Sequence, residues 1–239
     1  MNWPEVYQSN GWMMRPELLK LERIHMKTSR FFIAGKLALS LSIALPLHAA
    51  ENWVRYDAQP TGSMVKVDGT STVHDWSVKS QLIAGYIEFD SSFDLEKPAP
   101  GKVNAKASIV IPVRQIKSDK SSMDNVMYDA MKQKDHPRIE YHLTEITLKE
   151  APKAADAALI FDTKGELVVS GVTNKVAMPI TMTRADKDKL KFTGSTSVKM
   201  TSFGIQPPAP KIALGLISTG DDVKITFEWL TAKKVDAAK

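Results

Sequence analysis

Histidine and aspartate are the residues of this chain whose types could do chemistry, as general bases or as metal ligands. His74 is followed by Asp75, Asp135 is followed by His136, and His142 stands apart. A zinc site needs three or four converging ligands at short spacing. His142 alternates with apolar neighbours, which places it on the solvent-facing side of a strand. The spacing therefore predicts surface histidines and no metal site.

His74 differs from the other histidines in its surroundings. It lies in the polar and aromatic segment 69–76, GTSTVHDW, between two predicted strands. There it either hydrogen-bonds within the fold or offers a polar contact to a ligand. The first interpretation is favoured, because buried polar groups usually satisfy one another. His74 is retained as a candidate polar contact.

The common sequence signatures of enzymes are missing from this chain. It has no nucleophile elbow, glycine-rich phosphate loop or HExxH pattern. It has no cysteine, which removes thiol catalysis and thiolate metal sites. The acidic pair Asp221 and Asp222 follows Gly220 in a predicted turn, where solvated charge is typical. We therefore expect a protein that is not an enzyme and that carries no cofactor.

Alternation of apolar and polar residues dominates the chain after residue 50, which is typical of strands with one buried face. Polar residues separate the members of each apolar row. The rows are Val103, Ala105, Ala107, Ile109, Ile111 and Val113; Val176, Met178, Ile180 and Met182; Leu190, Phe192, Gly194, Thr196, Val198 and Met200; and Val223, Ile225, Phe227 and Trp229. This pattern predicts antiparallel strands with one wet and one dry face.

Short connections predict how these strands are joined. The turns at 170–174 and 185–188 are short enough to make hairpins. The apolar parity changes between Trp76 and Phe89, which predicts a bulge near residues 80–82. Pro179 lies on the polar face of its strand and predicts an edge or a bulge there.

One segment reads as a helix. Its apolar residues recur at helical spacing, with Ser121 or Ser122 placed to cap it and Asp124 in its first turn. These apolar residues are Met123, Val126, Met127, Ala130 and Met131. One helix among about eight strands predicts an all-β fold with a closed sheet and an accessory helix.

The N-terminal segment 26–50 reads as a secretory signal peptide. Lys27 and Arg30 form its basic region, 37–47 its apolar region, and Ala49 or Ala50 its cleavage residue. We expect residues 1–25 to be a mis-assigned upstream extension, with a genuine cytoplasmic tail as the alternative. For the segment 26–50 the alternative to cleavage is an uncleaved anchor. The apolar region is short for a membrane span, which needs about 20 residues, so no integral span is expected after cleavage.

We divide the residues after 50 into a domain at 51–232 and a charged tail at 233–239. Their composition limits the kinds of function that the domain can have. More than half of the formal net charge of +5 belongs to the first 50 residues. The domain is therefore nearly neutral and offers no case for nucleic acid, which would require a clustered basic face. An exported chain without cysteine relies on its core instead of disulfides. We expect a periplasmic protein, and whether two copies associate stays open.

Several segments resemble the YceI-like proteins, and the resemblance spans 53–230. The segments are 69–76, 84–90 (AGYIEFD), 136–141 (HPRIEY), 165–173 (GELVVSGVT) and 203–208 (FGIQPP). The resemblance implies a lipocalin-like antiparallel barrel of eight strands. It also implies that the barrel holds a polyisoprenoid or a related amphiphilic lipid, without enzyme chemistry.

The leading hypothesis is therefore a periplasmic protein that transports, stores or sequesters one such lipid. Its candidate lining comprises apolar residues of the strands, with two helix methionines as a lid: Ile109, Ile111, Met178, Ile180, Phe192, Phe227, Met127 and Met131. The alternative is a filled barrel that binds an envelope protein through surface loops such as the proline-rich 206–210.

Overall fold

The computed structural model describes residues 52–154, 157–209 and 217–235, and strands dominate them. The elements follow one another as β1 (Trp53–Ala58), β2 (Met64–Ser71), β3 (Trp76–Ser80), β4 (Ala84–Asp90), β5 (Gly101–Val103), β6 (Ala105–Pro112), η1 (Val113–Gln115), α1 (Ser121–Ala130), β7 (Arg138–Leu148), β8 (Leu159–Val169), β9 (Val172–Asp186), β10 (Lys189–Lys199), η2 (Met200–Phe203) and β11 (Thr219–Lys233).

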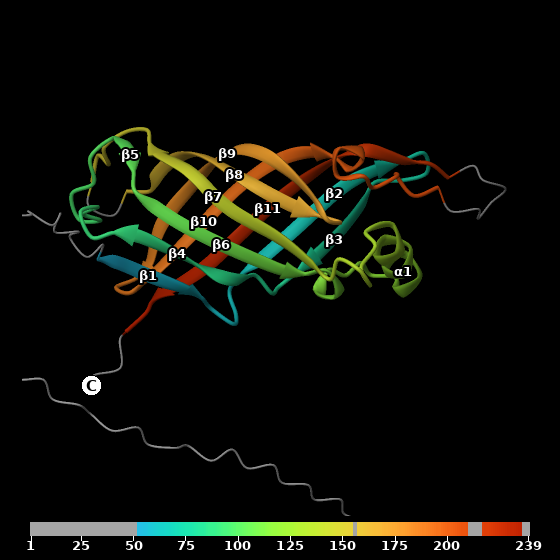
Figure 1. Cartoon of the computed structure of the whole chain (residues 1–239), viewed down its shortest axis with the longest axis horizontal. Helices are drawn as coiled ribbons and strands as arrows, with labels where there is room; N and C mark the ends of the chain where they lie inside the picture. The colour runs from blue at the N-terminus through green and yellow to red at the C-terminus, as the bar shows by residue number, and fades with distance from the viewer. Residues whose placement is uncertain (1–51, 155–156, 210–216, 236–239) are drawn as a thin grey trace, which may run out of the picture. The chain divides into compact units, whose positions relative to one another are not determined.

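The strands close into an antiparallel barrel. Its neighbours in order are β1, β4, β6, β7, β8, β9, β10 and β11, and β11 returns to pair with β1. The expected eight-stranded barrel with one accessory helix is therefore confirmed (Figure 1). Most connections join neighbouring strands, as the short turns predict.

The strands β2 and β3 lengthen one side of the ring. β2 pairs with β11 and with β3. The pair of β2 and β3 continues the antiparallel pair of β1 and β4. Residues 59–63 separate β1 from β2, and residues 81–83 separate β3 from β4. Ser80 and Ile83 are both buried although they are three positions apart, where strict alternation would put them on opposite faces. The sequence predicted a bulge here, whereas the structure ends β3 at Ser80 and begins β4 at Ala84, and this interruption shifts the alternation by one.

The hairpin between β8 and β9 has a two-residue loop. Ser170 and Gly171 have φ angles of 52° and 79°. Positive φ at both central residues is what a type I′ turn requires, and this turn matches the twist of the flanking strands. The predicted hairpin is confirmed.

The helix α1 lies at one end of the barrel, and the loop between β4 and β5 lies at the other (Figure 1). The expected serine cap is wrong: the N-cap residue is Lys120, without a capping side chain. The carboxylate of Asp124 instead accepts hydrogen bonds from the backbone N–H and hydroxyl of Ser118, each at 2.7 Å. These bonds attach the first turn of α1 to the segment that precedes it.

The buried face of α1 also differs from the methionine face expected from the sequence. Its buried residues are Asp124 and Tyr128, whereas Val126 is exposed. The Tyr128 hydroxyl donates to the carbonyl of Ile116 at 2.8 Å. Polar contacts to the chain just before the helix therefore decide which face of α1 turns inward.

Candidate functional site

The interior of the barrel is lined by alternate residues of each strand. In β8, Leu159, Phe161, Thr163, Leu167 and Val169 are buried, and the residues between them are more exposed. Most apolar residues of the rows expected in β6, β9, β10 and β11 belong to the same two core clusters. Val113 and Val223 are buried but belong to neither. Parity could relate these faces only to one another, and ring closure makes them the inner surface.

Burial changes along the inner rows. Towards the end that carries the β4–β5 loop, side chains such as Phe161, Phe192 and Met182 are almost fully buried. Further along the same rows, Met178 and Phe227 are only partly buried, although they pack against the same cluster. Neighbouring side chains therefore cover these two less completely than they cover those at the other end. Packing of the inner rows is complete at one end and incomplete towards the helix.

Two aromatic rings in the incompletely packed part lie against the wall, each close to a glycine. A Cβ added to Gly165 would lie 2.4 Å from the hydroxyl oxygen of Tyr141. A Cβ added to Gly194 would lie 2.8 Å from the ring of Phe227. Glycine within a strand commonly marks such a close approach. Both rings are thereby held along the wall and out of the centre of the barrel.

The β4–β5 loop covers the packed end of the barrel. The Phe93 ring stacks on Phe89, with centroids 5.4 Å apart, and meets Phe161 edge-on at 6.3 Å. Arg184 donates to the carboxylate of Glu96 at 2.7 Å and to the carbonyl of Leu95 at 2.8 Å. The loop is therefore held by an aromatic plug and by a guanidinium latch from β9.

A second cluster covers the helix end. Phe203 and Ile205, which follow β10, are buried against Leu167 and Val169 of β8. Met131, just after α1, packs against the same cluster. Side chains from three separate segments thus meet across this end, and both ends of the barrel are covered.

Few polar groups point into the barrel, and most have partners. The Thr163 hydroxyl donates to the carbonyl of Met178 at 2.8 Å, and that of Thr231 donates to the carbonyl of Leu190 at 3.2 Å. Burial raises the pKa of Tyr141, against a smaller opposing effect of the Thr163 hydroxyl. The buried indole N–H of Trp229 has no hydrogen-bond partner. The interior is predominantly apolar.

The structure brings the predicted strand residues together. Ile180 and Phe192 are buried in the first cluster, and the others from the strands are partly buried against it: Ile109, Ile111, Met178 and Phe227. The two lid methionines separate, because Met131 packs against the second cluster whereas Met127 belongs to neither. The ligand-binding role of all eight residues stays a prediction.

His74 and His142 lie outside the barrel lining. His74 is exposed in the turn between β2 and β3, with its Nδ1 2.9 Å from the carbonyl oxygen of Asp75. Its backbone N–H and C=O both bond to the hydroxyl of Ser71. These contacts agree with a role within the turn. His142 is exposed, as its place in the alternation predicts.

Sequence reasoning missed the residues that shape the interior. Tyr141 was recognised only as part of a motif, and Gly165 and Gly194 were not singled out for their lack of a side chain. A glycine on the dry face of a strand was the available signal, because it indicates close approach of another group. Phe93 carried no periodic signal, since it lies in a loop.

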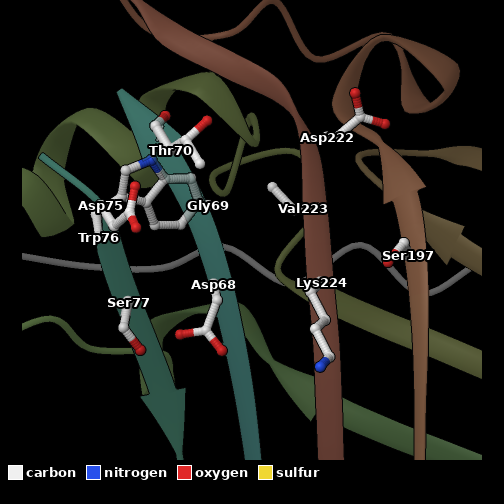
Figure 2. A pocket seen from close by; sticks show the side chains of 10 residues that line it. All are labelled: Asp68, Gly69, Thr70, Asp75, Trp76, Ser77, Ser197, Asp222, Val223 and Lys224. Atoms are coloured by element: carbon white, nitrogen blue, oxygen red, sulfur yellow. Dashed lines mark hydrogen bonds between the residues drawn. The ribbon is translucent and has the colours of Figure 1, made fainter. Parts of the chain in front are cut away.

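An outer hollow of about 490 Å³ lies across β2, β3, β10 and β11 (Figure 2). Asp68, Ser77, Lys224 and Asp222 contribute its polar rim, and the Trp76 indole donates to the carbonyl of Thr70 at 3.0 Å. A second outer hollow, of about 420 Å³, spans β7, β8 and β9. The charged and hydroxyl groups around both hollows do not suit a long apolar chain.

The described parts of the chain hold no group of three or more His, Asp or Glu residues that could bind a metal ion. Across the same residues, no helix has both the length and the apolar character needed to cross a membrane.

A protein-family comparison matches almost the whole length of the barrel, from β1 to β11. Residues 54–230 match the family model described as the YceI-like domain. A UPF0312 protein of Pseudomonas fluorescens is 30% identical over 149 residues, which cover 59% of this chain and 70% of that protein.

Two solved structures share the fold. BcnA of Burkholderia cenocepacia superposes with a TM-score of 0.53 at 18% identity, covering 70% of this chain and 95% of that one. A polyisoprenoid binding domain from Saccharophagus degradans, implicated in plant cell wall breakdown, gives a TM-score of 0.56 at 11% identity. That match covers 75% of this chain and 98% of the other. At these identities the likeness concerns the fold alone.

Proposed function

The chain belongs to the YceI-like domain family, and from this membership we propose that its barrel holds the apolar chain of a polyisoprenoid or similar amphiphilic lipid. The observation that carries the proposal is the incomplete burial of inward apolar residues. Met178 and Phe227 pack against the first core cluster on the inner face and yet keep accessible surface. A barrel of eight strands can either fill its interior or hold one small ligand.

The arrangement of aromatic rings supports the same function. Tyr141 and Phe227 lie against the wall because Gly165 and Gly194 leave room for them. A glycine-to-alanine change at either position would push a ring towards the centre. These two glycines therefore preserve width in the part of the barrel where packing is incomplete.

The chemistry of the interior suits a chain with few polar atoms. Each methylene moved from water into such a site contributes about 0.8 kcal/mol. A long isoprenoid chain could therefore bind tightly without a strong polar contact. The hydroxyls of Thr163 and Thr231 already donate hydrogen bonds within the fold, so the ligand need not supply an acceptor for them.

We propose further that the protein works in the periplasm as a carrier, store or sequestering protein. The supporting observation is the signal-like segment 26–50, which lies outside the described residues. The polyisoprenoid binding domain with the same fold supports the choice of ligand class. The proposed activity is binding and release, without chemistry on the ligand.

A filled barrel that binds an envelope protein is the second candidate. It is favoured by the covering of both barrel ends, by Phe93 at one and by Phe203 at the other. In that case the loop that includes residues 206–209 would contact the partner. The two candidates differ in whether purified protein contains or takes up lipid.

The deciding experiment uses protein expressed from Met26 with its own signal segment and purified gently from the exported fraction. Native mass spectrometry would give the mass of the intact protein, and organic extraction would identify any released lipid. We expect a stoichiometric long-chain lipid. Protein that remains free of lipid after incubation with polyprenols and quinones would overturn the proposal and favour the filled barrel.

A further inference from the structure

The wall of the barrel is split between β9 and β10. Their pairing begins at the hairpin and ends at Gly194 opposite Ile180. Both strands continue past this point, and the described residues 172–179 and 195–199 form no pairs with each other. Residues 172–179 remain paired with β8, and 195–199 remain paired with β11. We call this interval the β9–β10 seam.

The residues at the start of the seam explain why pairing ends there. Pro179 has no backbone N–H and cannot donate to a neighbouring strand. Gly194 lies under the ring of Phe227, and a Cβ at this position would also lie 3.1 Å from the carbonyl oxygen of Pro179. A proline and a glycine on facing strands thus mark the point where the strands separate.

Burial of the inner side chains falls at the same point. Before the seam, Met182 and Phe192 are 2% exposed. Along the seam, the inward side chains of both strands are only partly buried; they are Val176, Met178, Thr196 and Val198. The apolar Ile225 and Phe227 of β11 belong to the clusters behind them. Val176 and Val198 pack against the second cluster, so the seam opens onto the apolar lining at its other half, beside Met178 and Phe227.

The far end of the seam is bounded by a side-chain contact. The amide of Asn174 in β9 donates to the carbonyl of Ser202 in η2 at 2.7 Å. The seam is thus framed by Pro179 and Gly194 at one end and by this bond at the other. The five seam residues of β10 span roughly 16 Å at the rise of an extended strand.

We propose that the β9–β10 seam is the portal through which the apolar chain of an amphiphile enters and leaves the barrel sideways. This inference rests on the proposed lipid binding and adds its route. Both barrel ends are covered by packed side chains, whereas the seam lacks the ladder hydrogen bonds that close the rest of β9 and β10. Opening it requires no ladder bond to break.

The test closes the seam with a covalent bridge between two introduced cysteines. The chain has no native cysteine, so no other thiol can react. Continuing the register beyond Gly194 and Ile180 places Ser197 opposite Ala177, both on the outer face. The variant A177C/S197C would be bridged by oxidation or by a short bis-maleimide. The control variant is T181C/T193C. It places the same bridge on the same face of the same two strands, but between residues that already pair.

The measurement is the rate at which delipidated protein takes up a farnesyl chain carrying a dansyl group, followed by stopped-flow fluorescence. We expect the bridge in A177C/S197C to slow uptake and release at least tenfold, and reduction of a disulfide bridge to restore both rates. The bridged control should load at the wild-type rate. Equal loading by the bridged seam variant and the bridged control would overturn the portal.

Two further variants keep the test decisive if the bridge forms poorly. P179T restores a backbone N–H at the start of the seam, and slower uptake supports the portal whereas an unchanged rate contradicts it. R184A loosens the latch on the β4–β5 loop, and faster uptake would assign entry to that end and overturn the portal. A wild-type protein that takes up no probe would instead contradict the proposed lipid binding itself.

Discussion

The ring of Tyr141 in β7 lies directly across Gly165 in β8, so that a Cβ at residue 165 would be 2.4 Å from the tyrosine hydroxyl oxygen. Leu143 is the residue of β7 that pairs with Gly165, so the tyrosine ring reaches along the inner face towards the next position of the row. Because Gly165 has no Cβ, the tyrosine ring can lie against the wall of the barrel. A methyl group at residue 165 would push the ring inward and narrow the interior.

The change Gly165→Ala should therefore displace Tyr141 into the interior. We expect a loss of about 1 to 3 kcal/mol in the free energy of unfolding, as is common for overpacking. Urea unfolding followed by circular dichroism would measure it. The double variant G165A/Y141A provides the control, because removal of the ring should relieve the clash. Additive effects of the two changes would contradict the contact.

Filling the interior should distinguish an open barrel from a filled one. Met178→Trp adds a large side chain on the inner face, and Ala177→Trp adds the same side chain to the neighbouring outward position. In an open barrel, M178W should remain folded and lose bound lipid, whereas A177W should keep it. Native mass spectra would report the loss. Unchanged lipid occupancy in M178W would contradict the lining role of Met178.

The carboxylate of Asp124 should link the attachment of α1 to pH. Burial opposes its ionisation, but the hydrogen bonds from Ser118 and the nearby Lys117 ammonium outweigh burial and lower the pKa. A carboxyl whose pKa is lower in the folded state stabilises the fold above its unfolded pKa, which is about 3.9. This contribution is lost as pH falls through the folded pKa.

Asp124→Asn should therefore destabilise the protein most at neutral pH and least in acid. Removing the ionised acceptor from the partly buried donors of Ser118 costs about 1 to 3 kcal/mol. Thermal unfolding between pH 7 and pH 2 would show the two curves converging at low pH. The exposed Asp129 on the same helix gives the control variant D129N. Parallel curves for D124N and the wild type would contradict the linkage.

Tyr141 should produce the opposite pH dependence at alkaline pH. Burial raises its pKa, so the folded state holds the phenol proton more firmly than the unfolded chain does. The stability that follows is complete below the unfolded pKa of about 10. It is lost as pH rises from there through the folded pKa.

Tyr141→Phe should remove part of the alkaline loss of stability. Urea midpoints at pH 8 and above pH 10 would measure the difference. Tyr86→Phe serves as the control, because the Tyr86 ring lies beneath the Arg55 guanidinium and belongs to neither core cluster. An alkaline loss in Y141F as large as that of the wild type would contradict the assignment.

The loop that covers the packed end should depend more on its aromatic plug than on its ionic latch. Glu96 is largely exposed, and exposed ion pairs contribute about 0.2 to 1 kcal/mol. Phe93 contacts two buried phenylalanines, so Phe93→Ala should cost more than Glu96→Ala. Urea unfolding of the two variants would compare them, and an equal or reversed order would contradict this account.

Local pattern in the sequence determined the elements of the barrel. The alternation of residues 176–182 and 223–229 identified faces that the structure buries. The turn at Ser170 and Gly171 predicted its hairpin, and the change of parity before Ile83 predicted a bulge where the structure has the interruption between β3 and β4. These features depend on neighbours in the chain, because side chains alternate across a strand with a period of two.

Tertiary structure decided how those elements enclose a space. The burial of Asp124 and Tyr128 depends on the segment before α1, and periodicity alone favoured the methionine face instead. The contact of Tyr141 with Gly165 joins two strands, and the plug of Phe93 joins a loop to distant strands. No local period encodes such contacts.

The β9–β10 seam shows both contributions at one place. Pro179 predicted an edge or a bulge, since it lacks a backbone donor. Only the ring shows that this edge faces Gly194 and that the two strands separate there. Strand pairing and ring closure bring together residues far apart in the chain, so their outcome depends on the summed packing of the whole barrel and not on any single segment.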